Sequence, residues 1–168
     1  FVVENARVPV LETGFGVCHT YVHEGADLGK AGDIVFNAKV RRPSICNALD
    51  SLIVDKAIAS EFLPAITARL VSSGVIIKAT REAAAFIGDI DLVELASDED
   101  FDREFLSLEM VVSVVDSLEQ ALFHISSHGS GHSEAIVTED RRVGNRFLNE
   151  VDAGAVFLNA STQFTDGG

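Results

Sequence analysis

The sequence has little positive charge. Its 168 residues include 13 Lys and Arg against 26 Asp and Glu, which gives a formal net charge of −13 and a pI near 4.6. Because phosphate binding needs clustered Lys and Arg, this balance argues against a nucleic-acid surface. It equally disfavours binding to anionic membranes. We therefore expect neither nucleic acid nor a membrane among the partners of this chain.

Long apolar runs and cysteines are also scarce. No apolar run reaches the ~18 residues that a transmembrane helix needs. The opening residues, FVVENAR, lack the basic and apolar regions of a signal peptide, so we expect a cytoplasmic protein. Two cysteines, Cys18 and Cys46, are too few for a disulfide framework, although their spacing leaves a single bridge open.

The chain is nevertheless rich in apolar residues. They make up 47% of it, and the mean hydropathy is +0.24, which is too hydrophobic for a disordered chain. The length fits one domain. The chain starts without an initiator Met and stops at the turn-like segment Thr165–Gly168. We therefore expect a piece cut from a longer chain.

Short apolar runs rich in Val and Ile alternate with segments of helical period. This alternation predicts an α/β fold with a mostly parallel sheet and helices on both faces. The expected strands are Val8–Leu11, Val17–Val22, Ser51–Val54, Val75–Lys78, Leu92–Leu95, Met110–Val115, Ala135–Val137 and Ala155–Leu158.

Capping residues mark the starts of three expected helices. Asp27 precedes an apolar stripe, Asp140 opens the last helix, and Ser117 with Gln120 forms a capping-box pattern. A fourth helix is expected where apolar residues recur every four positions up to Leu70.

Two segments need a separate interpretation. Pro64 either kinks this fourth helix or falls in the first turn of a helix that begins near Ser60. The acidic segment Ser97–Asp100 is typical of a solvated loop.

The first candidate for chemistry is Cys46, in the segment RRPSICNA. Pro43 cannot continue a helix, so Cys46 is expected in a connecting loop, where functional residues are common. Arg41 and Arg42 would favour the thiolate, which is the nucleophilic form. The residues alone leave two interpretations open: a reactive thiol, or a small apolar side chain packed under the loop.

Histidines supply further candidates. Cys18 and His19 are neighbours in an expected strand, so their side chains point to opposite faces and we expect Cys18 in the core. The Gly-rich segment His128–His132 would let a backbone approach an anion or a metal closely, or it is an exposed connector. No third ligand has suitable spacing, so we expect no metal.

Two further segments, Gly14–Gly16 and Asn159–Thr162, are candidates for binding a ligand. Gly14–Gly16 fails as a dinucleotide fingerprint, because no third glycine follows and the next element is a strand. The segment Asn159–Thr162 follows the last strand, and open α/β sheets place ligands beyond the carboxyl ends of their strands.

Six segments carry a resemblance to a known family: VPVLETG, RPSICNAL, VVDSLEQAL, GSGHSEAIVTED, EVDAGAVFLNAST and FTDGG. They run in family order from Val8 to Gly168. With them the chain resembles the γ-glutamyl phosphate reductases, also called glutamate-5-semialdehyde dehydrogenases, of the aldehyde dehydrogenase superfamily.

The resemblance implies an oxidoreductase of proline biosynthesis that reduces L-glutamate 5-phosphate to L-glutamate 5-semialdehyde with NADPH. Cys46 occupies the position of the catalytic nucleophile. Its thiolate would displace phosphate and form a thioester, which hydride then reduces. The backbone N–H of Cys46 is one candidate donor to the oxyanion.

The resemblance also suggests roles for other residues. Glu12 is a possible general base and Glu104 a ligand of the nicotinamide ribose. Substrate-binding positions are His132, Ser133, Asn159, Ser161 and Thr162. The family usually has Arg where this chain has Gln163, which would weaken binding if that Arg holds a carboxylate or phosphate.

The superfamily's domain order makes residues 1–168 look like the nucleophile-bearing catalytic domain alone, with the NADPH-binding domain absent. We expect this piece by itself to be inactive and the whole protein to be a homo-oligomer. Two alternatives are a non-catalytic α/β module of the same fold and an oxidative aldehyde dehydrogenase.

Overall fold

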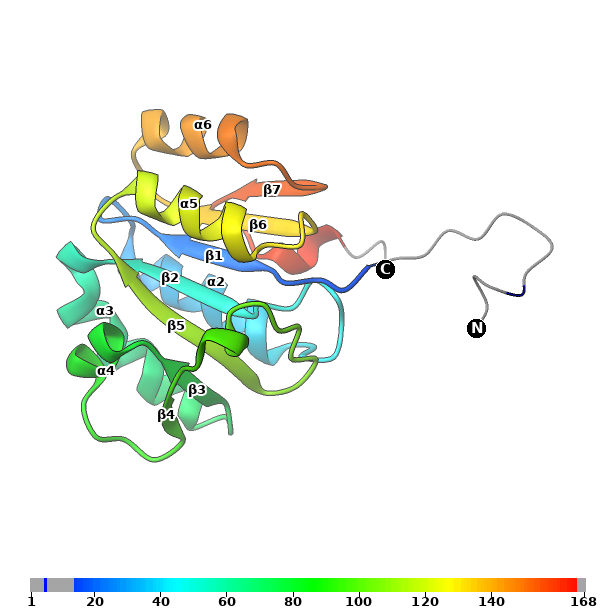
Figure 1. Ribbon diagram of the computed structural model, residues 1–168. Helices are drawn as coiled ribbons and strands as arrows, with labels where there is room; N and C mark the ends of the chain where they lie inside the picture. Colours follow the sequence, from blue (N-terminus) through cyan, green and yellow to red (C-terminus); the bar gives the residue numbers. More distant parts are fainter. Residues whose placement is uncertain (1–4, 6–13, 166–168) are drawn as a thin grey trace.

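The chain folds around one parallel β-sheet. A computed structural model describes residues 5 and 14–165, and within them seven strands lie in the order β4-β3-β5-β2-β1-β6-β7 (Figure 1). Every pairing between these strands is parallel. The strands are β1 His19–Val22, β2 Ser51–Asp55, β3 Ile76–Ala79, β4 Val93–Leu95, β5 Glu109–Val115, β6 Ser133–Val137 and β7 Ala155–Leu158. The α/β class with a mostly parallel sheet is confirmed.

Helices cover both faces of the sheet, as predicted (Figure 1). Helices α2, α3 and α4 pack on one face, and α5 and α6 pack on the other. Their bounds are α2 Leu28–Val40, α3 Lys56–Val71, α4 Arg81–Ile87, α5 Leu118–His128 and α6 Arg141–Glu150, and two 3-10 helices are η1 Asp98–Asp100 and η2 Thr162–Thr165.

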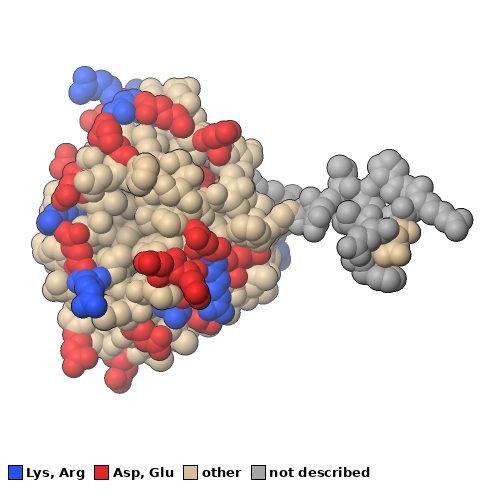
Figure 2. All heavy atoms as spheres, in the orientation of Figure 1, with Lys and Arg blue, Asp and Glu red and all other residues tan. Residues whose placement is uncertain are grey.

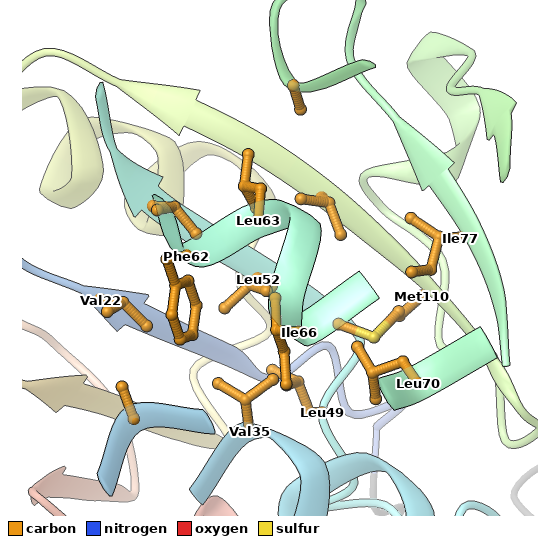
Figure 3. Packing of buried hydrophobic residues seen from close by; sticks show 14 of the residues in the cluster. Val22, Val35, Leu49, Leu52, Phe62, Leu63, Ile66, Leu70, Ile77 and Met110 are labelled. Atoms are coloured by element: carbon orange, nitrogen blue, oxygen red, sulfur yellow. The ribbon is translucent and has the colours of Figure 1, made fainter. Parts of the chain in front are cut away.

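The strand period of two divides the core between the two faces. In β2, Leu52 and Val54 join the cluster under α2, α3 and α4, whereas Ile53 joins the cluster under α5 and α6. Figure 3 shows Leu52 beside Phe62 and Ile66 of α3 in the first cluster. Because both faces are covered, every residue of the central strands β1 and β2 is buried.

The three predicted N-cap residues are confirmed, whereas the predicted capping box is not complete. The Asp27 carboxylate accepts from the Lys30 N–H at 2.9 Å, and Asp140 accepts from the first-turn amides of α6. Ser117 accepts weakly from the Gln120 N–H at 3.4 Å. The Gln120 side chain accepts from the N–H of residue 116, one position before the cap, so the capping box is shifted rather than complete.

Two sequence interpretations need correction. Helix α3 begins at Lys56, so a start near Ser60 is wrong and Pro64 lies inside the helix, where it leaves one carbonyl without its usual donor. The acidic segment Ser97–Asp100 is not simply solvated. Asp100 is buried, accepts from the N–H and hydroxyl of Ser97, and lies 3.4 Å from the Lys78 ammonium.

The parallel topology determines which loops meet. All strands run the same way, so loops that precede a strand lie at one edge of the sheet, here called the amino edge, and loops that follow a strand lie at the carboxyl edge. Residues 41–50, 102–108 and 129–132 precede β2, β5 and β6, and therefore share the amino edge. This edge holds the candidate site.

The surface is acidic but mixed. On the face shown in Figure 2, basic side chains lie beside acidic ones. In the part of the chain that the structure describes, no helix is both long and apolar enough to cross a membrane.

Candidate active site

Cys46 lies in the loop between α2 and β2, at the amino edge of the sheet. Its side chain is exposed and its thiol is free. A thiol packed under the loop as an apolar filler would be buried, so that interpretation is wrong. Pro43 lies in this loop and cannot continue α2, and the N–H of Leu49 returns to the Ala38 carbonyl of α2 at 2.9 Å. Cys46 is therefore presented to solvent from a loop anchored on α2.

The carbonyl groups of Cys46 and Asn47 are both held from beneath. The Cys18 thiol donates to the Cys46 carbonyl oxygen, with Sγ and O 3.4 Å apart. The Thr162 hydroxyl donates to the Asn47 carbonyl oxygen at 2.8 Å. A Cβ at Gly16 would collide with the same Cys46 oxygen, so only glycine permits this approach. The main chain at the nucleophile is thus fixed by segments far away in sequence.

Glu104 lies close to this loop. Its side chain is partly exposed, and its Oε1 is 3.4 Å from the position that a Cβ of Gly16 would take. A side chain at Gly16 would therefore meet both the Cys46 main chain and the Glu104 carboxylate. The next amide, that of Phe105, donates to the Asp50 carboxylate at 3.1 Å and anchors the Glu104 segment. The Glu104 carboxylate and the main chain of Cys46 therefore both lie close to Gly16.

A buried pair, Lys39 and Asp50, lies beneath these loops. The Asp50 carboxylate accepts from the N–H groups of Phe105 and Cys18, and the Lys39 ammonium lies 3.9 Å from it. Burial raises the pKa of Asp50 to about 6, against the opposing pull of Lys39. Burial also lowers the pKa of Lys39 to about 8, while Asp50 opposes that shift. This pair ties α2, β1 and the Glu104 segment into one support.

The sequence analysis missed this pair, although one signal was present. Lys39 lies four residues after Val35 and eight after Ala31, so it falls on the apolar stripe of α2 and is fully buried. A charged residue on an apolar stripe needs a buried partner. No periodicity in the loop identified Asp50 as that partner.

His132 and Ser133 also reach the amino edge. His132 Nδ1 lies 2.9 Å from the Ser133 hydroxyl and 3.9 Å from Cys18 Sγ. The turn before them depends on Gly131, whose φ of +73° suits glycine. His132 therefore approaches the same thiol that holds the Cys46 carbonyl.

His19 points the other way, as the strand alternation predicts. Its Nδ1 lies 3.0 Å from the Glu134 carboxylate on the face covered by α5. Cys18 and His19 do not pair, and the expectation of a buried Cys18 is confirmed. Burial, with Glu134 and Asp50 nearby, raises the pKa of the Cys18 thiol.

The two imidazoles of the Gly-rich segment do not converge. His128 Nδ1 lies 2.7 Å from the Asp102 carboxylate, whereas His132 faces Cys18. Among residues 5 and 14–165, no group of three or more His, Cys, Asp or Glu is arranged to hold a metal ion.

The segment Asn159–Thr162 is divided between the two edges. Asn159 has a φ of +56°, and its amide pairs with both the N–H and the carbonyl of Thr138 at the carboxyl edge. It does not join the group around Cys46. The chain then turns back towards the C-terminus of α2, where Gln163 bonds to the Ala38 carbonyl and Thr162 bonds to the nucleophile loop.

Ser161 is buried and accepts from the Gln163 N–H at 3.2 Å. Asn159 and Ser161 also line a cavity of about 350 Å³ against α2, together with Asn37 and Arg41. These two residues therefore serve the return turn and this cavity rather than the thiol itself.

Gln163 is a structural residue in this fold. Its side chain is buried, and its amide donates to the carbonyl oxygens of Ala38 at 2.8 Å and Arg42 at 3.4 Å. It thereby satisfies carbonyls at the C-terminus of α2. The Gln163 side chain faces the protein interior, so it is not placed to contact a substrate anion.

Glu12 and the strand expected at Val8–Leu11 lie outside the described residues. The described part of the site is an exposed Cys46 thiol on an anchored main chain, with the Glu104 carboxylate near that main chain and the His132 imidazole near Cys18. An exposed thiol held in this way is suited to nucleophilic attack on a small electrophile and to a covalent intermediate.

Comparisons with known proteins find relatives along almost the whole of this chain. The chain is 52% identical over 166 residues to the γ-glutamyl phosphate reductase of Syntrophomonas wolfei, covering 99% of this chain and 39% of that protein. A crystal structure of γ-glutamyl phosphate reductase from Thermotoga maritima superposes with a TM-score of 0.93 at 44% identity, over 99% of this chain and 40% of that one. No family model matches the sequence.

An acetylating aldehyde dehydrogenase from Geobacillus thermoglucosidasius superposes with a TM-score of 0.72 at 22% identity, over 97% of this chain and 44% of that one, which shows a shared fold. The chain spans about two fifths of the length of the reductases it matches. It is thus homologous, along its whole length, to part of γ-glutamyl phosphate reductase, and it has the fold of the aldehyde dehydrogenases.

Proposed function

We propose that this chain is the nucleophile-bearing catalytic domain of a γ-glutamyl phosphate reductase, which reduces L-glutamate 5-phosphate to L-glutamate 5-semialdehyde with NADPH. The observation that carries the proposal is the exposed, free Cys46 thiol on an anchored loop at the amino edge. The 52% identity with a named reductase supports the same assignment.

The proposed reaction begins at Cys46. Its thiolate attacks the acyl carbon of the acyl phosphate, the C–O bond to phosphate breaks, and a thioester forms on Sγ. During attack the carbonyl oxygen gains negative charge, and the Cys46 backbone N–H is suited to donate to it. Phosphate is a good leaving group, so this step needs no strong acid. Addition of a hydride and a proton then releases the semialdehyde and frees the Cys46 thiol.

The nicotinamide cofactor supplies the hydride when it is bound. Glu104 fits a role in holding it, because its carboxylate is partly exposed beside Gly16 and can accept hydrogen bonds from ribose hydroxyls. We propose that the rest of NADPH is bound mainly by a part of the whole protein that lies outside this chain. We also propose that the whole protein is cytoplasmic and homo-oligomeric. The 168-residue chain alone is then expected to be inactive.

We propose that His132 contacts the substrate at the amino edge, and that Thr162, which is fully buried, contributes by holding the nucleophile loop. The His132 Nδ1 atom lies 3.9 Å from Cys18 Sγ, and the Thr162 hydroxyl donates to the carbonyl oxygen of Asn47, the residue after the nucleophile. Ser133 supports His132 at 2.9 Å. Glu12 stays a proposal as a general base.

The test uses the full-length protein in the oxidative direction, with semialdehyde, inorganic phosphate and NADP. Reduction of NADP should require phosphate, and Cys46→Ala should lower it by about 10³-fold or more, as expected for loss of a covalent nucleophile. Phosphate-independent reduction would indicate an oxidative aldehyde dehydrogenase. No reduction by the unmodified protein would indicate a non-catalytic module.

A further inference from the structure

Cys18 is a second thiol at the site, and the proposed reaction does not use it. It immediately precedes β1 and is fully buried. Its Sγ lies 3.4 Å from the Cys46 carbonyl oxygen and 3.9 Å from His132 Nδ1.

The protonation of Cys18 suits a donor. Burial is the main cause that raises the pKa of its thiol, and the neighbouring Glu134 and Asp50 carboxylates raise it further. The thiol therefore keeps its proton at neutral pH and does not compete with Cys46 as a nucleophile. A neutral S–H group is a weak hydrogen-bond donor to a carbonyl oxygen.

The main chain around Cys18 is itself fixed. Its N–H donates to the Asp50 carboxylate at 3.4 Å, and its carbonyl accepts from the N–H groups of Asp50 and Ser51 at 3.0 and 3.1 Å. Two residues earlier, Gly16 lies so close to the Cys46 carbonyl that a Cβ there would collide with it. The donor is thus held rigidly against the nucleophile loop.

We infer that Cys18 is a positioning residue, whose S–H bond to the Cys46 carbonyl fixes the peptide group that follows the nucleophile. That bond restricts the backbone torsion of Cys46, and with it the directions of Cys46 Sγ and of the Cys46 N–H. Small displacements of reacting groups lower rates steeply, so the bond affects catalysis more than substrate binding. The inference rests on the proposed function only where it names Cys46 as the nucleophile.

The test compares four forms of the full-length protein: unmodified, Cys18→Ala, Cys18→Ser and Val22→Ala. Serine keeps a donor at this position and alanine removes it. Val22→Ala is the matched control, because Val22 is buried at the far end of β1. Two readouts are measured: kcat and KM of the reductase, and hydrogen–deuterium exchange of the peptide spanning residues 41–50.

Cys18→Ala should lower kcat about tenfold without changing KM, and should speed exchange in the 41–50 peptide about fivefold, as expected for the loss of one hydrogen bond. Cys18→Ser should return both values to within about threefold of the unmodified protein. Val22→Ala should leave both unchanged.

The inference would be overturned if Cys18→Ala exchanged in the 41–50 peptide at the rate of the unmodified protein. It would also be overturned if Cys18→Ser matched Cys18→Ala in kcat and in exchange rate. The exchange readout needs no turnover. It therefore judges the positioning role even if the unmodified protein proves to have no reductase activity, a result that would count against the proposed function alone.

Discussion

The buried Asp50 carboxylate should leave a distinct mark on the pH dependence of folding. Its pKa is raised to about 6 from 3.8, chiefly by burial, and its side chain is only 4% exposed. The difference of about 2 corresponds to about 3 kcal/mol, since each pKa unit is worth about 1.4 kcal/mol. The folded chain therefore binds this proton more tightly than the unfolded chain does.

The sign follows from the direction of the shift. A group with a raised folded pKa stabilises the fold fully below its unfolded pKa, and that stabilisation is lost as the pH rises through the folded pKa. Asp50→Asn removes the titration. The free energy of unfolding of the unmodified chain, minus that of Asp50→Asn, should fall by about 3 kcal/mol between pH 4 and pH 7.

Urea unfolding of the 168-residue chain at several pH values measures this difference. In Asp50→Asn the buried Lys39 loses its partner, and its pKa falls further. Deprotonation of Lys39 at higher pH then stabilises the folded Asp50→Asn variant. The free energy of unfolding of the unmodified chain, minus that of the variant, therefore falls further as the pH rises. Asp33→Asn is the matched control, because Asp33 is exposed and pairs with Arg69 at the surface. A difference for Asp50→Asn that stays constant from pH 4 to pH 7 would refute the assignment of a raised pKa.

Three further variants test other parts of the fold and site. Gln163→Leu removes the donor to the last carbonyls of α2 and should lower the free energy of unfolding by about 1–3 kcal/mol; unchanged urea midpoints would contradict the capping role. Asp140→Ala removes an N-cap with two bonds and should cost about 1 kcal/mol by the same measurement, and a neutral result would mean that the cap is not formed in solution. Glu104→Gln in the full-length protein should raise KM for the nicotinamide cofactor about tenfold with a smaller effect on KM for the acyl substrate, because an amide accepts fewer hydrogen bonds than a carboxylate. If Glu104→Gln and the unmodified protein had the same KM for the nicotinamide cofactor, Glu104 would not belong to the cofactor site.

Much of the fold was predictable because local patterns and tertiary packing agree. The strand predicted at Ala155–Leu158 has the same bounds in the structure, and the predicted caps Asp27 and Asp140 mark the starts of α2 and α6. Helix α4 was missed, because seven residues are too few to show a helical period, and its cap, Thr80, gave the main local signal. Strand β6 begins at Ser133 rather than Ala135, two residues earlier than apolar character alone indicates.

The sequence by itself identified Cys46 as a loop thiol and, through its motifs, the family to which the chain is related. Loop position follows from local chemistry, since Pro43 cannot continue α2. Contacts between distant residues were decided only by the tertiary structure. The Cys18 bond to Cys46, the Lys39–Asp50 pair and the placement of Asn159 at the opposite edge all depend on which strands are neighbours and on their common direction. Buried polar groups must find partners wherever the packed sheet brings them, and no periodicity along the chain records that choice.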